Sequence, residues 1–559
     1  MVKKLFEMMG KEIVGLHEAA YLLAFFAFLS QILALVRDKL LAYNFGAGEV
    51  LDIYYSAFRI PDLIFVSIAS IVSASVLVPF FIDRFNNDSD KGRRFIDSIF
   101  SAFFLGIVGI SIITYFFIPY LTSLLFPGFA NSDLLPELIT ASRILLLSPI
   151  FLGFSNFLSS ITQMHKRFLI YALSPILYNV GIIFGILFLH PIMGLNGLIW
   201  GVVIGAFLHM VIQIPFIIHR DTFPRLRLSV YWSDIKKVVF ISLPRTLTLS
   251  SNQLASFFLV SLASYMSGGS ISVFSLAFNL QAVPMTIIGV SYSSAIFPTL
   301  SKFFVEKNRK EFLQQMIDSA RHIVFWSIPI TILFIVLRAQ IVRTIYGAGQ
   351  FNWSDTRLTA AVLAIFIVSV MGQSLILLFV RAYYAEGKTK KPLIINVFSG
   401  LLIVVFGYVL TKIFFAFPVF RYFLEDLFKV SGQIGTSVLV LPLAYSIGVL
   451  INTYLHWHLF EKDYNGFSKP VIATLFQSFS ASVIMGYVTF ISLRFFNIFF
   501  PLTKAWNVFF QGFFAGIVGI IVGIIVLIML KNKEIEEIWR TLHHKFWKSD
   551  VVVPDQETL

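Results

Sequence analysis

Fourteen apolar segments, each long enough to cross a membrane, constrain this chain more than any other feature. A helix needs about 20 mostly apolar residues to span a bilayer. The segments run approximately over residues 18–43, 51–82, 95–126, 137–163, 168–190, 194–218, 236–265, 271–301, 319–345, 358–384, 391–416, 433–459, 470–498 and 505–530. The sequence therefore predicts an all-α polytopic membrane protein with about fourteen transmembrane helices.

The composition excludes an ordinary soluble protein. Hydrophobic residues make up 57% of the 559 residues and charged residues only 13%, whereas soluble domains contain about 25% charged residues. The formal net charge is +13, but basic residues of membrane proteins collect in cytoplasmic loops, so we expect no nucleic-acid partner. The absence of cysteine excludes disulfides and thiolate metal sites.

The basic residues also predict the topology. Of the 43 Lys and Arg residues, 29 lie in the two terminal segments and in the loops that fourteen spans place on the same side as both termini. This bias predicts that both termini are cytoplasmic. No small-residue cleavage site follows the basic N-terminus, so we interpret the first apolar run as a retained span rather than a signal peptide.

A weak repeat relates the two halves of the chain at an offset of about 220 residues, pairing 57–60 with 277–280 and 174–180 with 391–397. Six spans per repeat is an even number, so both halves share one orientation, and we expect two pseudo-symmetric six-helix lobes plus two C-terminal helices. The predicted parts are an N-lobe at 1–230, a C-lobe at 231–460, spans 13 and 14 at 461–530, and a cytoplasmic tail at 531–559.

Two segments outside the spans also carry predictions. Residues 417–430 read as a short interfacial helix on the outer face. The polar tail after Lys531 reads as a solvated helix followed by disorder.

Charged residues gather around the glycine-rich turn between the first two spans. The ionisable residues there are Arg37, Asp38, Asp52, Arg59 and Asp62. A charge at the centre of a membrane helix costs about 2.5–3.5 kcal/mol on insertion scales. The cluster therefore suggests a water-filled cavity or a paired network rather than contact with lipid.

Arg37 and Asp38 are the strongest binding candidates. Adjacent helix positions point about 100° apart, so we expect Arg37 to reach an anionic group while another base, such as Arg59, holds Asp38. The alternative is that both residues anchor a helix end in the membrane interface.

Asp52, Arg59 and Asp62 form a second candidate group. Asp52 and Arg59 are two helical turns apart and share a face with Asp62 nearby, and Pro61 can bend their helix. We expect a charged wall in a bent, mobile helix; the alternative is a structural ion network.

The second half offers fewer charged candidates. Its matching wall is polar but uncharged and contains Asn252, Gln253, Asn279 and Gln281. Arg245 is equally consistent with a binding site and with an anchor, whereas Arg143 and Arg381 fit interfacial anchors better.

Enzyme motifs are absent from the sequence. It contains no HExxH and no GxxxxGK[ST], which argues against a zinc hydrolase and against direct ATP drive. A membrane-embedded transferase acting on a lipid-linked sugar would need a catalytic acid or His facing a loop, and none stands out. We therefore expect a transporter rather than an enzyme.

The chain resembles the MurJ (MviN) family of lipid II flippases, within the multidrug/oligosaccharidyl-lipid/polysaccharide exporter superfamily. The resemblance spans about residues 20–530 and is carried by Val36-Arg37-Asp38, Phe45-Gly46-Ala47-Gly48, Asp52, Ala57-Phe58-Arg59-Ile60-Pro61, Phe297-Pro298-Thr299-Leu300-Ser301-Lys302, Tyr346-Gly347, Gln350-Phe351, Arg381-Ala382-Tyr383-Tyr384-Ala385 and Lys391-Pro392.

The resemblance implies that the protein moves lipid II, an undecaprenyl-pyrophosphate-linked glycan, from the inner to the outer leaflet of the bacterial plasma membrane by alternating access. It implies a monomer among membrane lipids, without a cofactor, driven by membrane potential or an ion gradient. Spans 13 and 14 would bound a groove for the lipid tail. The implied head-group site contains Arg37, Asp38, Asp52, Arg59, Arg245 and Asn279.

The chain departs from the family pattern at several positions. Gln31 and Asn279 stand where the family usually has Arg, and Phe65-Val66 and Ser70-Ile71 replace a basic pair and a Glu-Gly step. Asn396 fits part of a sodium site described in relatives, but the acids of that site are absent. These departures leave open a flippase or exporter of another polyprenyl-linked glycan or of a small molecule, and a non-transporting scaffold.

Overall fold

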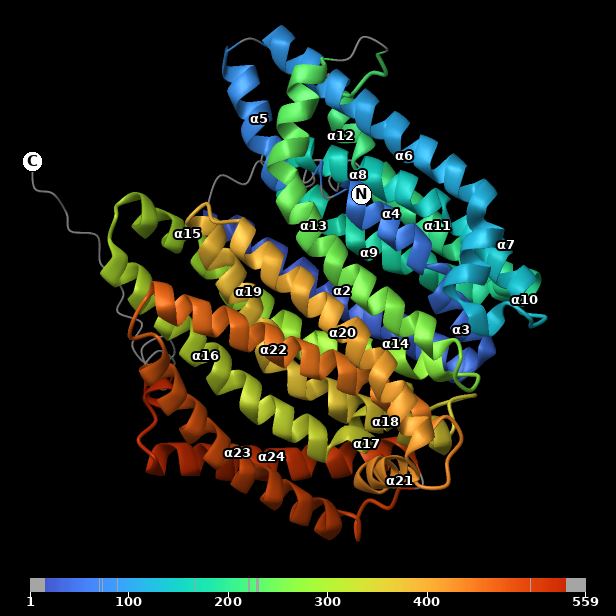
Figure 1. Ribbon diagram of the computed structural model, residues 1–559, viewed down its shortest axis with the longest axis vertical. Coiled ribbons are helices and arrows are strands. Elements are labelled where there is room, and N and C mark those ends of the chain that lie inside the picture. Colours follow the sequence, from blue (N-terminus) through green and yellow to red (C-terminus); the bar gives the residue numbers. More distant parts are fainter. Residues whose placement is uncertain are drawn as a thin grey trace, which may run out of the picture. The chain divides into compact units, whose positions relative to one another are not determined.

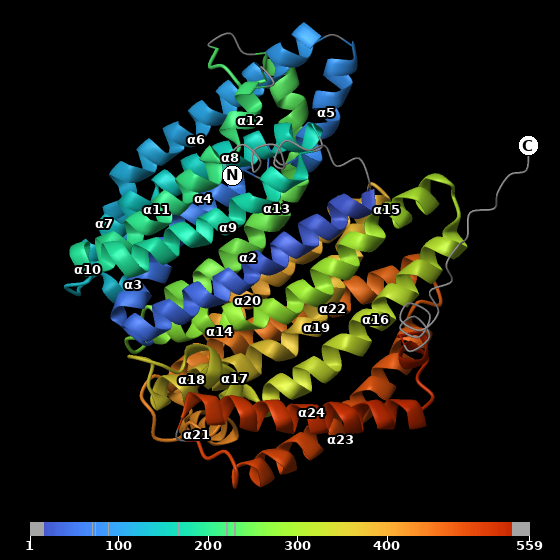
Figure 2. The ribbon, with the colours of Figure 1, turned by 180° about the vertical axis from the view of Figure 1, so that it is seen from behind.

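The computed structural model describes residues 16–538, apart from positions 70, 73, 88, 166, 220, 221, 228–230 and 503. Within these residues every regular element is helical, which confirms the predicted all-α fold class. Figures 1 and 2 show the helices from opposite sides.

The helices of the first half cover residues 16–263. They are α2 (Leu16–Phe45), α3 (Glu49–Ala57), α4 (Arg59–Ala69), α5 (Ala74–Asn87), α6 (Ser89–Leu125), η1 (Pro127–Phe129), α7 (Leu135–Leu145), α8 (Leu147–Met164), α9 (Phe168–Phe184), η2 (Gly185–Leu189), α10 (His190–Met193), α11 (Leu195–Val211), α12 (Ile214–His219) and α13 (Trp232–Ala263).

The helices of the second half cover residues 270–529. They are α14 (Ser270–Met285), η3 (Thr286–Val290), α15 (Ser291–Val305), α16 (Arg309–Val336), α17 (Arg338–Tyr346), α18 (Trp353–Phe366), η4 (Ile367–Ser369), α19 (Val370–Ala385), α20 (Lys390–Ala416), α21 (Pro418–Leu427), η5 (Thr436–Leu439), α22 (Val440–Asp463), α23 (Ser468–Phe496) and α24 (Ala505–Met529).

Eleven helical stretches in the described part of the chain are long and apolar enough to cross a membrane. They coincide with predicted spans 3 to 6 and 8 to 14. Spans 1 and 7 correspond to α2 and α13, single helices of 30 and 32 residues that are not among the eleven. The chain is therefore a multi-pass membrane protein, while the count of fourteen spans stays a prediction.

Predicted span 2 is divided into three helices instead of one. The first break lies at Phe58, between α3 and α4. Pro61 has no backbone N–H and cannot bond to the carbonyl of Ala57 four residues earlier, which accounts for the end of α3 at Ala57. A second break separates α4 from α5. The bend expected from Pro61 is thus an interruption of the helix.

The chain forms two compact units. Unit 1 comprises Met1–Leu280, Ile345–Phe366 and Lys388–Ile451, and unit 2 comprises Gln281–Thr344, Ile367–Gly387 and Asn452–Leu559. These units combine segments from both halves of the sequence. The division into an N-lobe, a C-lobe and a pair of C-terminal spans stays a prediction.

In unit 1, α9 packs against both α2 and α11, and Figure 2 shows α2 in blue running beside α9. The contact with α11 has no room for side chains at its centre, because a Cβ on Gly181 would lie 2.3 Å from the Cα of Gly205. Small residues allow such close approach of membrane helices. This contact fixes the position of α9, which carries one of the polar residues of the site described below.

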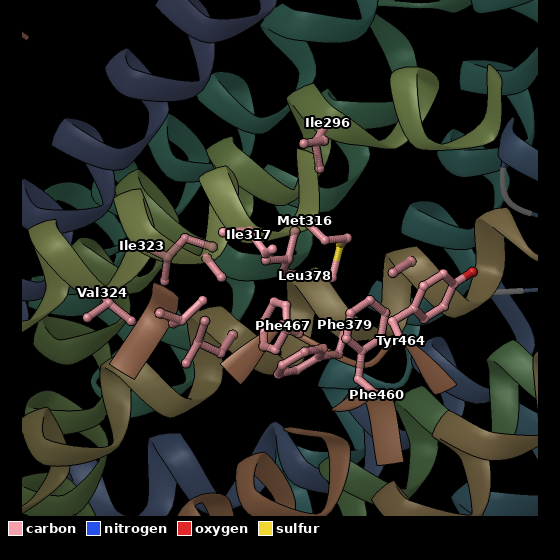
Figure 3. Close-up of a cluster of buried hydrophobic side chains, with 14 of the residues drawn as sticks. Ile296, Met316, Ile317, Ile323, Val324, Leu378, Phe379, Phe460, Tyr464 and Phe467 are labelled. Atoms are coloured by element: carbon pink, nitrogen blue, oxygen red, sulfur yellow. The ribbon is translucent and has the colours of Figure 1, made fainter. Parts of the chain in front are cut away.

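Unit 2 contains an aromatic core formed by α15, α16, α19, α22 and α23. Figure 3 shows part of this cluster, including Met316, Phe379, Phe460 and Phe467. The ring of Phe467 lies 5.5 Å from Phe379 and 5.0 Å from Phe460. Edge-to-face pairs of this kind stabilise a core beyond the burial of apolar area.

The described part of the C-terminal tail is docked on unit 2, so the prediction of a solvated helix is wrong at its start. Asn532 and Glu534 are buried. Glu534 Oε1 lies 2.7 Å from Arg321 Nη2 and accepts a hydrogen bond of 2.9 Å from Thr474 Oγ1. The partners lie 60 residues or more away in the sequence, so local composition gave no signal of them. The predicted disorder concerns residues outside the described part.

The helix predicted within residues 417–430 is present as α21. It exposes Val419, Tyr422 and Phe423. Its buried Glu425 accepts hydrogen bonds from Arg421 Nε at 2.8 Å and from Thr436 Oγ1 at 2.6 Å. An amphipathic surface of this kind suits a membrane interface, and the location on the outer face stays a prediction.

Candidate substrate site

Arg37 and Asp38 lie near the end of α2 and pair with each other. Arg37 Nε donates to Asp38 Oδ1 at 2.8 Å, and Arg37 Nη2 lies 2.8 Å from the same oxygen. The expectation that Asp38 would be held by Arg59 is therefore wrong. Adjacent helix positions diverge at Cα, but the long Arg side chain folds back far enough to reach its neighbour.

Two asparagines complete this network from other helices. Arg37 Nη1 donates to Asn179 Oδ1 on α9 at 3.1 Å, and Asn279 Nδ2 on α14 donates to Asp38 Oδ2 at 3.0 Å. Asp38 is 2% exposed, whereas Arg37 retains 20%. The Asp38 carboxylate is thus enclosed by donors, while the guanidinium keeps one accessible side.

Asp52 on α3 binds the beginning of α14 and not another ion of the predicted wall. Its Oδ2 accepts from the backbone N–H of Gly269 at 2.6 Å, and its Oδ1 accepts from the Ser272 N–H at 2.7 Å and the Ser272 hydroxyl at 2.5 Å. A carboxylate at a helix N-terminus satisfies free N–H groups and the helix dipole. Asp52 is therefore a cap supplied to α14 from more than 200 residues away, and a role in substrate binding stays a prediction.

Tight glycine turns surround this cap. Gly269 has φ +87°, and a Cβ there would lie 2.2 Å from the carbonyl oxygen of Ala47. Gly349 has φ +60°, and a Cβ there would lie 2.2 Å from the carbonyl oxygen of Tyr43, which also accepts the N–H of Gln350 at 2.9 Å. The turns before α3, α14 and α18 therefore interlock through backbone contacts that only glycine permits.

Arg59 begins α4 and differs from Arg37 in having no hydrogen bond or close ion pair among the described residues. Its side chain is half-buried, and its Nε is fully buried without a hydrogen bond. No ion pair within the described residues joins it to Asp52 or Asp62, although the negative charge of Asp62 lies near it; the charged wall stays a prediction. Burying a guanidinium without an acceptor costs free energy unless an anion or a water molecule accepts its hydrogen bonds.

Tyr55 connects the two arginines electrostatically. Its hydroxyl is buried without a hydrogen-bond partner, and the charges of Arg37, Asp38 and Arg59 lie near it. Arg37 and Arg59 thus belong to one polar region, which we call the arginine network and define as Arg37, Asp38, Tyr55, Arg59, Asn179 and Asn279.

The two remaining candidates are less defined. The side chain of Arg245, on α13, lies outside the described part of the structure. Asn396 is buried on α20, and its role in a sodium site stays a prediction. Among the described residues, no group of three His, Asp or Glu side chains is arranged to hold a metal ion.

The network contains two residues that the sequence reasoning did not propose as site residues. Asn179 had a usable signal, because it is an amide within the apolar segment 168–190. Tyr55 had none, since a tyrosine beside Tyr54 in an apolar helix is ordinary; only the fold shows that its hydroxyl lies among charges.

A second feature suited to a lipid ligand lies in unit 2. A groove of about 960 Å³ runs between α16, α23 and α24, and the start of the tail closes part of it. Its walls are almost entirely aliphatic and aromatic, and include Phe325, Leu333, Met485, Ile524 and Ile535. A surface of this composition binds hydrocarbon and offers few hydrogen bonds to a polar group.

Comparison with known proteins identifies the family. Residues 41–510 match the family described as lipid II flippase MurJ. The probable lipid II flippase MurJ of Rickettsia prowazekii is 27% identical over 390 residues, covering 69% of this chain and 76% of that protein. The lipid II flippase MurJ of Burkholderia cenocepacia is 24% identical over 400 residues, covering 70% of this chain and 77% of that protein.

Solved structures share the fold. A lipid II flippase MurJ in an inward closed conformation matches with a TM-score of 0.72 and 23% identity, over 93% of this chain and 100% of that one. An inward-facing multidrug resistance MATE transporter of the MOP superfamily matches with a TM-score of 0.64 and 16% identity, over 78% of this chain and 96% of that one. The family match extends over most of the chain, and the chain belongs to the lipid II flippase MurJ family.

Proposed function

We propose that this protein moves lipid II from the inner to the outer leaflet of the bacterial plasma membrane by alternating access. The observation that carries the proposal is the arginine network, in which Arg59 is half-buried and has no hydrogen-bond acceptor among the described residues. A charge within a membrane helix costs about 2.5–3.5 kcal/mol, and an anionic ligand that accepts hydrogen bonds from Arg59 would offset part of this cost. The family match supports a lipid-linked pyrophosphate as that ligand.

The head group binds through Arg59 and the accessible side of Arg37. A guanidinium offers a planar fork that binds a phosphate through two hydrogen bonds. Asp38 and Asn179 hold Arg37 in place, so the ligand meets a pre-oriented donor. Arg245 and Asn279 complete the head-group site in this proposal, with Asn279 acting through Asp38.

The polyprenyl tail occupies the groove between α16, α23 and α24. Its aliphatic walls suit a long hydrocarbon chain, and its volume of about 960 Å³ is at the upper end of sites that hold small ligands. Chemically, the polar network and the apolar groove match the two ends of the same lipid.

Alternating access requires one end of the helical bundle to open and close. With both termini in the cytoplasm, the turn between α2 and α3 lies at the outer end. The Asp52 cap and the interlocked glycine turns hold α3 and α14 together there, so we assign these contacts to the closed outer gate. The driving force in this proposal is membrane potential or an ion gradient, with no cofactor and with a single chain as the working unit.

A second candidate is a flippase for another polyprenyl-linked glycan. The observation that favours it is Asn279, which contributes a neutral amide to Asp38. Gln31 and Asn279 both stand where the family usually has Arg, so this chain has fewer cations at these positions than its relatives usually have. A head group of different charge or shape would then fit the same network.

The test is to replace the flippase of a depleted bacterium with this chain and to measure lipid II exposed on the outer leaflet. We expect restored growth and restored exposure. Normal membrane abundance without restored exposure would contradict lipid II as the substrate. Binding of a different undecaprenyl-pyrophosphate glycan by the same purified protein would then favour the second candidate.

A further inference from the structure

A second arginine without an ion-pair partner among the described residues lies in a groove on the surface of unit 1, apart from the arginine network. The groove has a volume of about 520 Å³ and is formed by α6, α7, α8 and α11. Its lining is apolar except for Ser111, Tyr115, Thr140, Arg143 and Trp200.

Arg143 carries the only charge in this lining, and most of its donors are unused. Its guanidinium lies 4.8 Å from the centre of the Tyr115 ring, and its Nε donates a long hydrogen bond of 3.4 Å to the Tyr115 carbonyl. Neither Nη atom has an acceptor among the described residues, and no carboxylate pairs with the side chain there. Both Nη atoms are therefore available to a ligand.

Two hydroxyl groups add to the polar character of the groove. Ser111 is 4% exposed, and its Oγ is buried without a partner. It lies one helical turn before Tyr115, so both residues share a face of α6. Thr140 donates its hydroxyl to Pro136 at 2.9 Å, which leaves its oxygen lone pairs free. These hydroxyl groups make the groove more polar near Arg143 than along the rest of its lining.

The surroundings of the groove define where that molecule comes from. The neighbouring α6 side chains Ile113, Phe117 and Tyr120 are strongly exposed, on a helical stretch apolar enough to cross a membrane. Such a surface faces hydrocarbon, so the ligand enters from the bilayer. Arg143 is eight residues after the start of α7, about 12 Å along that helix, and therefore lies in the first third of a 30-residue stretch that is apolar enough to cross a membrane.

We propose that this groove is a binding site for a membrane phospholipid, distinct from the route of the transported lipid. The phosphate accepts hydrogen bonds from the two Nη atoms of Arg143, and one acyl chain lies along Ile112, Ile150 and Leu147. A charge-assisted, two-point bond to phosphate suits an arginine at this position, because both Nη atoms of Arg143 lack an acceptor among the described residues.

The test uses the purified, delipidated full chain with two probes, phosphatidylglycerol and a diacylglycerol with the same acyl chains, in native mass spectrometry. We expect retention of phosphatidylglycerol and not of diacylglycerol. Arg143→Gln should weaken phosphatidylglycerol binding about tenfold or more. The matched control is Arg494→Gln, which removes another arginine stacked on an aromatic ring, 4.7 Å from the Phe490 centroid, and should leave binding unchanged.

A second variant tests the acyl-chain position without altering charge. Leu147→Trp adds bulk to the groove lining and should also weaken phosphatidylglycerol binding, whereas Phe117→Trp on the neighbouring exposed surface should not. Equal binding by Arg143→Gln and Arg494→Gln, or by Leu147→Trp and Phe117→Trp, would overturn the proposal. Displacement of phosphatidylglycerol by equimolar undecaprenyl phosphate would also overturn it, because the groove would then belong to the lipid-linked substrate.

Discussion

The arginine network of unit 1 and the apolar groove of unit 2 use opposite means to accept a ligand. In the network, each partner of Asp38 is held at 2.8–3.0 Å, and Arg59 has no hydrogen bond or close ion pair among the described residues. In the groove, the lining residues are almost all hydrocarbon. Directional hydrogen bonds select a head group by its chemistry, whereas an apolar wall selects a hydrocarbon chain only by its volume and shape.

This difference indicates how tolerant each region is to change. Removing one member of the network leaves a buried charge without compensation, a loss that is large and specific. Changing the groove alters packing by one side chain, and apolar surfaces adapt to such changes at moderate cost. Substitutions in the two regions should therefore differ in size of effect and in which end of the lipid they disturb.

The largest effect is expected from Arg37→Ala. This change removes one pyrophosphate ligand and leaves Asp38 without its ion pair, so we expect lipid II transport to fall to the level of empty vesicles while the protein still inserts. Transport assays at matched membrane abundance measure this effect. Arg494→Ala, which removes a cation outside the network, serves as the control and should transport normally. Normal transport by Arg37→Ala would remove Arg37 from the head-group site.

A large effect is also expected from Asp52→Ala, through the gate rather than through the ligand. Each of the three lost hydrogen bonds to the carboxylate contributes about 1.5–3 kcal/mol, so the closed outer end should be strongly destabilised and transport should slow about tenfold or more. The chain has no native cysteine, so Ser270→Cys is a clean reporter of opening at the start of α14.

The reporter should be protected in the parent chain and labelled rapidly when Asp52→Ala is added. Glu49→Gln, which changes an exposed acid in the first turn of the same helix, is the matched control and should leave labelling slow. Equal labelling of the two variants would show that the Asp52 cap does not hold the gate.

A moderate effect is expected from Ile524→Trp in the groove. The added volume should compete with the lipid tail at the low end of the cost of overpacking, about 1 kcal/mol, and reduce lipid II binding about fivefold. Binding of a soluble pyrophosphate head-group analogue should not change. Ile521→Trp, on the same helix but outside the groove lining, should bind both ligands as the parent does; if it weakens lipid II equally, the tail does not lie in this groove.

The smallest effect on transport is expected from Glu534→Gln, at the end of the groove. The substitution breaks a buried ion pair with Arg321, a type of contact whose rupture costs about 3–5 kcal/mol. We expect the tail to undock and trypsin to cleave faster at Lys531 and Lys533, with less than about a twofold change in transport. Glu536→Gln changes an exposed neighbour and should not alter cleavage; unchanged cleavage in Glu534→Gln would contradict the docking.

The fold class was readable from the sequence because membrane crossings leave a local signal. Length and apolarity located eleven helical stretches that are long and apolar enough to cross a membrane, and Pro61 marked a bend in span 2 since its missing N–H is a local property. The pairing of Arg37 with Asp38 was not readable, because it depends on how a flexible side chain folds back.

Contacts between distant segments account for the remaining differences. The sequence around Asp52 does not indicate that its carboxylate caps a helix that begins at Ser270. The sequence around Glu534 does not indicate that this residue pairs with Arg321. From the sequence, the two acids were expected to be solvated or to bind a ligand. In the structure, each carboxylate binds other groups of the protein. Asn179 was detectable as an isolated amide in an apolar segment, but the sequence did not indicate that its partner is Arg37.

The most direct test of the account is to measure transfer of lipid II across the bilayer of proteoliposomes containing the purified chain. The account predicts transfer by the parent protein, and transfer by Arg37→Ala no faster than in protein-free liposomes. Transfer by Arg37→Ala at the parent rate would contradict the assigned head-group site. No transfer by a folded parent protein under an imposed membrane potential or ion gradient would contradict the proposed function itself.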